Sequence, residues 1–570
     1  MATANVSSDP IPNDVQPNCH TKHADPDISR RSDPSPPPRF PPTVPISTAL
    51  LPSDDAAVPD LLNRIQVTGK EYTTNHLHHD TTDDNRHQKN SVRLALLAHA
   101  RALVHALETP RETMIKHCWA EPSAAMCLAV GVDTGLFHHL SCDDAGCPCM
   151  KGRQGGGGGE RGGGERTEQT HHRPVSSISP PAQRDTDQDP NNPSGEASTQ
   201  AATAAATAAA ANRTDDDKNN DKSNPKSLPF LSHRTGIPVP LLSRLLRHLT
   251  AMSHIRQPTP TTFLPTPFSS ALTHPCIGDG YPVILASLPS LTCFPQYAKL
   301  TGYREPDDPR DGPYQFGVRT SRGFFEDVGV KRPLLEEFGN HMGGYRQGRR
   351  SWWDEGVYPV RERVVEGAGL EEEEEGKVLL VDVGGGFGHD VRAFAAAFAD
   401  VVGSSRGRGK GRLVLEDLPE VVGQIGEEGL VVVGGDRDGD EVRIERVGCD
   451  FFEENPVRGA RAYYLHSVLH DWPNPLASAI LTRIAQAMQP GYSRLLIHEN
   501  CIPAQGAHWE ATALDMMMLG LVASKERTES EWRELIGATV RADGCRLEVV
   551  GIWGGGEEEG MESLIECVLV

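Results

Sequence analysis

The chain has 570 residues, enough for two or three domains of about 100 to 200 residues each. Its formal net charge of −22 argues against a nucleic-acid partner, because such surfaces need Lys and Arg side chains that neutralise phosphates. Only 37% of the residues are hydrophobic and 6% are aromatic, while 56 are Gly and 44 are Pro, so part of the chain should be unable to bury a core.

Two long segments are predicted to be disordered. Residues 1–90 are dense in Pro, Asp, Asn, His and Ser and show no sustained apolar period. Residues 141–227 contain no Phe, Trp or Tyr and include the low-complexity tracts "GRQGGGGGERGGGER" and "TQAATAAATAAAANRTDDD". We therefore expect a disordered N-terminal extension and a disordered insertion, both dispensable for chemistry.

The segments on either side of the insertion carry helical patterns. Residues 111–140 and 239–255 have apolar residues at helical spacing, and "TTFLPTPFSSAL" at 261–272 resembles a short hairpin. Two helices followed by a small β wing predict a winged-helix-like module, formed by residues 91–140 and 228–345. Because the chain is acidic, a role in dimerisation or as a substrate lid is favoured over DNA binding.

Signals for targeting and for metal binding are weak. The first residues, "MATANVSSDPIPND", lack a basic stretch with a following apolar core, and no run of about 18 apolar residues occurs. We expect a cytoplasmic protein without membrane contact, whose 12 mostly scattered cysteines are reduced. One cluster, "CDDAGCPC" with His138 and His139 nearby, does not have the usual zinc spacing, so we predict no metal site.

Strands and helices alternate in residues 346–570, which predicts a parallel α/β sheet. The apolar run "KVLLVDV" is followed by a turn with Gly384, Gly386 and Gly388, and then by a helical pattern. A dinucleotide turn, G-x-G-x-x-G, would need a glycine where this chain has His389, so the spacing disfavours NAD. The preceding Asp382 would repel a pyrophosphate, but it suits a ligand that carries an ammonium group.

Polar side chains follow the next four predicted strands. "RLVLEDLP" ends in an acidic pair, of which Asp417 is placed to accept ribose hydroxyls, and the next strand ends in Asp450 and Phe451, which suit an adenine edge and face. "ARAYYLHSVLHDW" contributes His466 and His470, and "SRLLIHEN" contributes Glu499. Open parallel sheets bind ligands at the carboxyl ends of their strands, so these residues are expected to form one site.

The ordered set "VDVGGGFG", "LEDLP", "GCDFF", "LHSVLHDW", "HENCIPA" and "SKERTESEW" resembles the plant-type and fungal small-molecule O-methyltransferases that use S-adenosylmethionine. The resemblance covers residues 95–140 and 228–570. It implies a Rossmann-like methyltransferase domain preceded by the winged-helix module, and a homodimer in which one subunit closes the pocket of the other.

The resemblance also assigns roles to single residues. It places Gly384, Gly386, Asp417, Asp450 and Phe451 at S-adenosylmethionine. It makes His470 the general base, flanked by Glu499 and Glu526, and it places Met517 and Met518 of "LDMMMLGL" against an aromatic substrate, although ordinary core packing suits these methionines equally well. Plant members often have Lys four residues before the base, where this chain has His466, which we expect on the cofactor side of the site.

These features favour methyl transfer to a hydroxyl of a small aromatic metabolite, phenolic or polyketide-like. A catalytically inactive, methyltransferase-like regulator or scaffold is the alternative, and degraded glycine or base positions would favour it. All of those positions are present in this chain. An NAD-linked oxidoreductase is disfavoured by the spacing of the turn.

Overall fold

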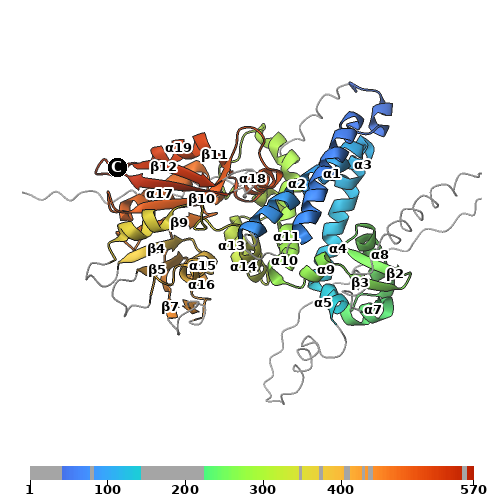
Figure 1. Cartoon of the computed structure of the whole chain (residues 1–570), viewed down its shortest axis with the longest axis horizontal. Helices are drawn as coiled ribbons and strands as arrows, with labels where there is room; N and C mark the ends of the chain where they lie inside the picture. The colour runs from blue at the N-terminus through green and yellow to red at the C-terminus, as the bar shows by residue number, and fades with distance from the viewer. Residues whose placement is uncertain are drawn as a thin grey trace, which may run out of the picture.

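The computed structural model describes residues 42–77, 83–142, 224–345, 349–370, 377–403, 411–426, 430–433, 441–554 and 562–570. Within these ranges the chain forms a large α/β domain, a middle group of helices and a smaller N-terminal module (Figure 1). No helix in this part of the chain is both long enough and apolar enough to span a membrane.

The α/β domain is built on a mixed sheet of order β12-β13-β10-β9-β4-β5-β8, with β11 paired to β10. Its central strands β8, β5, β4, β9 and β10 are parallel, whereas β13 runs antiparallel to both β10 and β12. This arrangement confirms the predicted α/β class and its Rossmann-like parallel centre. The strands are β4 (Val378–Val383), β5 (Arg412–Asp417), β8 (Glu445–Gly448), β9 (Ala462–His466), β10 (Arg494–Ile502), β11 (Arg527–Thr528), β12 (Leu547–Gly554) and β13 (Glu562–Leu569).

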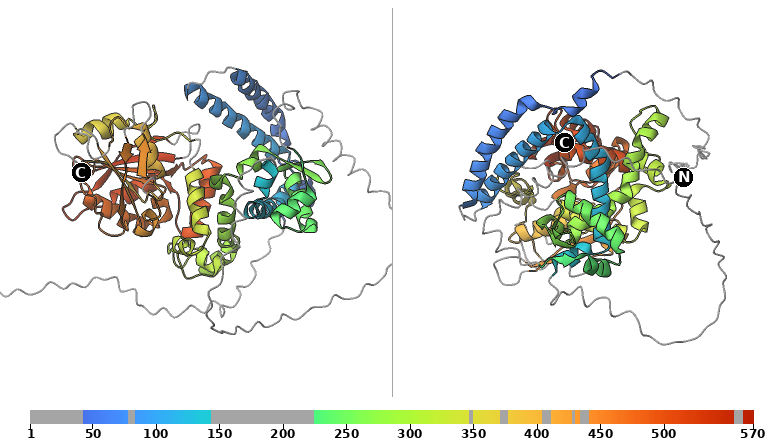
Figure 2. Two further views of the ribbon diagram at one scale, coloured as in Figure 1. Left: turned by 90° about the horizontal axis from the view of Figure 1, so that it is seen from below. Right: turned by 90° about the vertical axis from the view of Figure 1, so that its right-hand side faces the viewer.

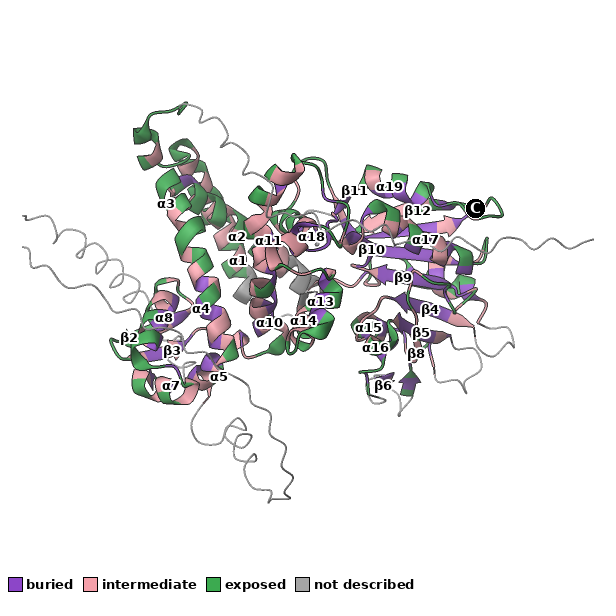
Figure 3. Cartoon of the chain, turned by 180° about the vertical axis from the view of Figure 1, so that it is seen from behind, coloured by how far each residue is buried: buried purple, intermediate pink, exposed green. Residues whose placement is uncertain are grey.

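Helices cover both faces of this sheet, because successive side chains of a buried strand point to opposite faces. Tyr463 of β9 packs in one core with α17 (Asn474–Ala487) and α19 (Glu529–Gly537). Its neighbour Tyr464 packs in the other core, with Trp352, α15 (His389–Ala397) and α16 (Pro419–Val422). Strands β4, β5, β9 and β10 are accordingly buried along most of their length, whereas β8 at the edge is not (Figure 3). Near the sheet lie the short elements η7 (Arg361–Val365), η8 (Glu366–Ala368), β6 (Val431–Val433), β7 (Glu441–Arg443) and η10 (Leu469–Asp471).

The N-terminal module contains the helices and the small β-sheet that the sequence predicts, and its assignment as a winged helix stays a prediction. Leu140, Leu231, Leu246 and Phe263 are buried in one core beneath a three-stranded sheet of order β1-β3-β2. The hairpin spans 255–265, earlier than predicted, because the apolar period of α8 ends at Ala251 and residues 267–271 form a helix capped by Thr266. The elements are α4 (Glu121–Asp133), α5 (Leu136–Ser141), β1 (Lys226–Ser227), α7 (Leu228–Thr235), α8 (Val239–Ala251), β2 (Ile255–Thr259), β3 (Thr262–Pro265) and α9 (Pro267–Ala271).

The prediction that residues 1–90 are disordered is wrong for a substantial part of that range. Helix α1 (Val58–Leu77) packs against α2 (Asp83–Leu107) as a helical hairpin (Figure 1). Leu61, Ile65 and Thr68 form a narrow, half-buried stripe on α1, and such a short apolar period is easily missed among polar residues. The hairpin follows η2 (Ile46–Leu50) and η3 (Asp55–Ala57), and it leads into α3 (Pro110–Ile115) and η4 (Lys116–Ala120).

Two other sequence predictions concern the insertion. Residues 143–223, which include most of "CDDAGCPC", lie outside the described residues, so the predicted disorder there stays a prediction. At its C-terminal end the predicted range 141–227 is too long, because Lys226 and Ser227 pair with β3 as strand β1.

A middle group of helices lies between the large sheet and the winged-helix module (Figure 2). Tyr314, Phe324 and Val328 of this group share a core with Met518 of α18, which brings a helix of the α/β domain into contact with the preceding segment. Helix α18 also contacts β10 and the short η10 segment that follows β9. The helices are α10 (Pro275–Gly278), α11 (Gly280–Thr301), α12 (Pro313–Val318), α13 (Phe324–Val330), α14 (Leu334–Tyr345) and α18 (Trp509–Val522).

Candidate active site

The glycine turn joins β4 to α15 in a conformation that requires glycine. Gly384, Gly386 and Gly388 have φ values of +69°, +57° and +72°, in the left-handed region that other residues rarely adopt. A side chain on Gly384 would also come within 3.0 Å of Val468, whereas one on Gly386 would meet no atom within 4 Å. The turn is therefore open at Gly386, where a ligand can approach the backbone.

Asp417 ends β5 directly beside this turn. The N–H of Gly386 donates to its Oδ2 at 2.8 Å, and the N–H of Leu418 donates to its Oδ1 at 2.7 Å. Burial raises the pKa of Asp417 above its usual value, and the Gly386 and Leu418 bonds oppose that rise. The half-buried carboxylate is thus fixed in orientation, and each oxygen has acceptor capacity left for a ligand hydroxyl.

Asp382 lies beneath the glycine turn. It is 1% exposed, and a Cβ atom on Gly385 would come within 2.6 Å of its carboxylate. Burial and the charge of Asp390 raise the pKa of Asp382 to about 8, although His466 opposes this. The predicted contact of Asp382 with a ligand ammonium group stays a prediction, and the geometry gives the residue a clear role in supporting the turn.

Asp450 and Phe451 follow β8 at the same edge of the sheet. Asp450 is exposed and its Oδ1 accepts the N–H of Phe452 at 3.0 Å, while the Phe451 ring packs edge-on against Trp472 with centroids 5.9 Å apart. The Cβ position of Gly384 lies 3.6 Å from the Phe451 ring. The structure therefore brings Phe451 to the glycine turn, as predicted, and leaves Asp450 available to a ligand.

His470 lies in a buried group of carboxylates. Its Nδ1 is 2.6 Å from Glu526 Oε1 and 3.6 Å from Glu499 Oε2, and its Nε2 is 3.6 Å from Asp471 Oδ1. Burial lowers the pKa of His470, but Glu499, Glu526 and Asp471 outweigh it and raise that pKa well above the usual range. This is the arrangement of a base whose second nitrogen is oriented by a third group, with Glu526 as the closest partner.

Glu499 flanks His470, with Oε2 3.6 Å from Nδ1, and it also holds the neighbouring backbone. Its Oε1 accepts the backbone N–H groups of Val468 at 2.9 Å, Leu469 at 2.7 Å and His470 at 3.4 Å, so it fixes the backbone of the segment that carries the base. It also lies within β10, which continues to Ile502, rather than at the strand end. Burial raises the pKa of Glu499, whereas the charge of His470 opposes that rise.

Arg527 was not predicted, although it directly follows Glu526. It is fully buried and donates to the carbonyl oxygens of Leu469 at 2.8 Å and of Trp472 at 2.7 Å. It thereby holds both ends of the short segment that includes His470. The letters "KERT" marked this position, but only the folded chain shows which backbone atoms the guanidinium reaches.

His466 ends β9 on the sheet face opposite to the core that contains Leu465. Its Nδ1 is 2.8 Å from Asp390 and its Nε2 is 3.1 Å from Glu562, a partner that sequence analysis did not identify. Burial lowers the pKa of His466, but Asp390 and Glu562 raise it to about 9 overall. A contact between His466 and a cofactor stays a prediction.

The two methionines of α18 differ in their surroundings. Met518 is buried in the core with Tyr314 and Phe324, and Met517 is half-buried against the same cluster. Core packing thus accounts for Met518, and contact of either residue with a substrate stays a prediction. The same helix reaches the carboxylates around the base, because Asp515 Oδ1 accepts the N–H of Glu526 at 2.9 Å.

Two groups among the described residues have the composition and spacing of metal ligands. They are His470 with Glu499 and Glu526, and His466 with His498 and Glu562. In the first group, Nδ1 of His470 faces Glu526 and the chain supplies hydrogen-bond partners for Glu499, which suits a proton-transfer group. The second group is considered further below.

Comparisons with known proteins show the family of the chain. A family profile described as "O-methyltransferase domain" matches residues 370–540, which contain the glycine turn, His470, Glu499 and Glu526. O-methyltransferase asqD of Emericella nidulans is 34% identical over 343 residues, which cover 60% of this chain and 80% of that protein. O-methyltransferase mpaG of Penicillium roqueforti is 29% identical over 522 residues, which cover 90% of this chain and 99% of that protein.

The chain therefore belongs to the family of S-adenosylmethionine-dependent O-methyltransferases. Among solved structures, OxaC is similar over 90% of this chain and 99% of its own, with a TM-score of 0.61 and 18% identity. A protein described as a pericyclic reaction enzyme is similar over 90% of this chain and 99% of its own, with a TM-score of 0.60 and 20% identity. At these identities the structural likeness supports the fold alone.

Proposed function

We propose that the chain transfers a methyl group to a hydroxyl of a small aromatic metabolite, with His470 as general base. The observation that carries the proposal is the 2.6 Å contact between His470 Nδ1 and Glu526 in a buried site. This contact directs the other nitrogen, Nε2, away from Glu526 and leaves it to accept the acceptor's proton. When bound, S-adenosylmethionine supplies a methyl group on a positively charged sulfur.

The carboxylates around His470 make the proton transfer from a phenol to His470 less unfavourable. A phenol has a pKa of about 10 and an ordinary histidine of about 6.5, so the transfer costs roughly 4.8 kcal/mol at equilibrium. Glu499 and Glu526 stabilise the imidazolium and raise the pKa of His470, although its burial opposes them. They therefore reduce this cost, while His470 must be neutral before it accepts the proton.

The cofactor is proposed to lie along the edge formed by the ends of β4, β5 and β8. Gly384 and Gly386 allow close approach to the backbone, Asp417 accepts the ribose hydroxyls, and Asp450 and Phe451 contact the adenine. His466 and Asp382 lie below the methionine end of the site and support it. This placement rests on the open turn at Gly386 and the fixed carboxylate of Asp417.

The acceptor is proposed to bind on the other side of His470, against α18. Met517 would contact the aromatic ring, since it is half-buried beside the cluster that contains Tyr314 and Phe324, and Met518 would support it from the core. OxaC has been solved with meleagrin and with oxaline, so a protein of this fold can bind small organic molecules. The intact glycine turn and the intact base group disfavour the alternative of an inactive regulator or scaffold.

A homodimer is proposed from exposed apolar side chains on the N-terminal helices. Trp119 is 65% exposed, and Val104, Leu107, Met114 and Met126 are each 48% exposed on α2, α3 and α4. Exposed apolar side chains gathered on neighbouring helices are typical of protein interfaces. Light scattering at micromolar concentration should give twice the chain mass, and Trp119→Glu should shift it toward the monomer; a wild-type monomer would contradict the proposal.

The function is tested by methyl transfer from labelled S-adenosylmethionine to a panel of phenolic metabolites. His470→Gln keeps most of the volume of the side chain but cannot act as a base near neutrality. Its turnover should fall by about 10² to 10⁴, the usual contribution of a positioned base, with cofactor affinity nearly unchanged. Near-normal turnover on a weakly acidic phenol would reject His470 as the base, and an inactive wild-type protein across the panel would favour the scaffold alternative.

A further inference from the structure

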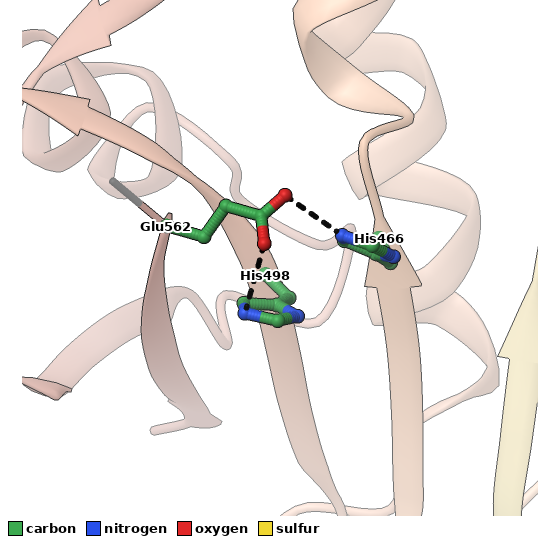
Figure 4. A group of neighbouring side chains, drawn as sticks. All are labelled: His466, His498 and Glu562. Carbon is green, nitrogen blue, oxygen red and sulfur yellow. Dashed lines mark hydrogen bonds and ion pairs between the residues drawn. The ribbon is translucent and has the colours of Figure 1, made fainter. Parts of the chain in front are cut away.

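His466, His498 and Glu562 project from three neighbouring strands onto one face of the sheet (Figure 4). His466 of β9 and His498 of β10 are direct partners in the parallel ladder, and Glu562 starts the antiparallel strand β13 on the other side of β10. Their candidate ligand atoms all lie within 4.8 Å of one another. None of these three side chains takes part in the proposed proton transfer at His470.

The two imidazoles are held by their outer nitrogens. Nδ1 of His466 lies 2.8 Å from Asp390, and Nδ1 of His498 lies 2.9 Å from the hydroxyl of Tyr464. The two Nε2 atoms remain, and both face the Glu562 carboxylate, at 3.1 Å from His466 and 3.9 Å from His498. Metal-binding histidines usually have this organisation, in which an outer partner fixes the tautomer and the ring orientation.

The distances suit a small divalent ion after a modest adjustment. Bonds of about 2.0 to 2.1 Å in a tetrahedral site place neighbouring ligand atoms about 3.3 Å apart. The separations from the Glu562 carboxylate are 3.1 Å from Oε1 to Nε2 of His466 and 3.9 Å from Oε2 to Nε2 of His498, so a small rotation of the carboxylate would present one oxygen to an ion between the two rings. The His466 and His498 rings are already stacked, with centroids 4.6 Å apart.

The surrounding charges also favour a cation. Asp390 lies against His466, and Arg349 contacts both Glu510 at 2.8 Å and Glu562 at 3.6 Å. The carboxylates of Asp390, Glu510 and Glu562 therefore carry three negative charges. The opposing positive charge is that of the Arg349 guanidinium and, when His466 is protonated, that of its imidazolium. A divalent ion bound to neutral imidazoles would balance the remaining negative charge, which one proton cannot do.

We propose that His466, His498 and Glu562 bind one divalent transition-metal ion of the Zn²⁺ type, with one coordination position left for water. Two imidazole nitrogens and one carboxylate oxygen are ligands that Zn²⁺ accepts in proteins. The proposal departs from the sequence-based expectation of no metal site, which considered only a local cysteine spacing. His466 and Glu562 are 96 residues apart, so no local spacing could reveal them.

Imidazole nitrogens bind a metal only when they are deprotonated, so the affinity should fall as the pH is lowered. The ion would link β9, β10 and β13, so it should also raise the unfolding temperature of the protein.

The test is a calorimetric titration of the full chain with Zn²⁺ alone, after alkylation of its cysteine thiols. The wild-type protein should bind one equivalent that is lost in His498→Gln and in Glu562→Gln. His233→Gln removes one exposed imidazole of the winged-helix module and should keep that equivalent. Tyr464→Phe removes the hydroxyl that contacts both Nδ1 of His498 and Asp390, the outer partner of His466, and should weaken binding by about 10- to 100-fold.

A second measurement covers the case in which a variant fails to fold. X-ray absorption of the zinc-loaded wild-type protein should show only nitrogen and oxygen neighbours at about 2.0 Å. The proposal is overturned if the alkylated wild-type protein binds no Zn²⁺, or if the folded His498→Gln and Glu562→Gln variants keep its stoichiometry and affinity. The proposal would also be overturned if the only tight zinc site of the unalkylated protein has sulfur neighbours at about 2.3 Å.

Discussion

Replacing Glu526 by Gln should move the pH dependence of methyl transfer in a defined direction. Glu526 is the closest carboxylate to His470, with Oε1 2.6 Å from Nδ1, and Gln keeps its shape without its charge. A neighbouring opposite charge shifts a pKa by about 1 to 3 units. Glu499 and Asp471 remain at 3.6 Å, so we expect a shift of about 1 to 2 units, which corresponds to roughly 1.4 to 2.7 kcal/mol.

The sign follows from the charges. Glu526 stabilises the imidazolium, so its removal lowers the pKa of His470 from its raised value. In Glu526→Gln, the pH range over which the single-turnover rate rises should therefore shift to lower pH by about 1 to 2 units. The plateau rate should fall by about 10- to 100-fold, because the neutral histidine is then a weaker base toward a phenol.

The assay is single-turnover transfer from labelled S-adenosylmethionine to a weakly acidic phenol between about pH 5.5 and 10, so that product release does not limit the rate. Glu529→Gln is the matched control, because Glu529 is exposed and pairs only with Arg533 across one helical turn. It should leave both that pH range and the plateau unchanged. A pH range that stays in place or moves to higher pH in Glu526→Gln would refute the assignment of Glu526 as the partner that charges His470.

Three further predictions concern other parts of the chain. Asp417→Ala should weaken the calorimetric affinity for S-adenosylmethionine by about tenfold or more, because charge-assisted hydrogen bonds contribute roughly 1.5 to 3 kcal/mol; unchanged affinity in a folded variant would count against the ribose contact. The pKa of His466 is about 9, so its contribution to the free energy of unfolding should be present below about pH 6.5 and lost as the pH rises toward 9. In denaturant titrations with a chelator present, the free energy of unfolding of the wild-type protein should fall by up to about 3 kcal/mol across that pH range. The His466→Gln variant should lack this contribution. Deleting residues 1–41 and replacing residues 143–223 by a short linker should preserve turnover. Deleting residues 1–90 should lower turnover, because that deletion removes α1. Equal turnover of the two deletion variants would contradict a role for α1.

The sequence could predict the parallel sheet and the edge where its functional groups gather. Strands β4, β5 and β9 are mostly apolar runs followed by a turn or a polar residue, a pattern that follows from burial on both faces. The glycines of the turn were equally predictable, since Gly384, Gly386 and Gly388 all adopt positive φ values. Chemistry at the ends of parallel strands follows from topology, so residue order alone brings Asp417, Phe451 and His470 together.

The missed features depend on contacts between segments far apart in the chain. Helix α1 has only a narrow apolar stripe, and its stability comes from packing on α2, which no local period reveals. Arg527 acts on the carbonyl oxygens of Leu469 and Trp472, and Glu562 acts on His466. Such roles depend on where a side chain ends in space, whereas residue spacing reports only on neighbours along one element.

The two histidines of "LHSVLHDW" show how one short segment serves two faces of the sheet. His466 is the last residue of β9. Because side chains alternate along a strand, it lies on the same face as Tyr464, where it contacts Asp390 and Glu562. Ser467 then adopts a positive φ of +51°, the ladder ends, and the chain turns through η10. His470 consequently lies with Glu499 and Glu526 instead of with the neighbours of His466. The departure from the strand at Ser467 thus separates His466, which is paired with two carboxylates at the sheet face, from His470, for which we propose proton transfer. On that proposal the two histidines should respond differently to pH and to metal ions.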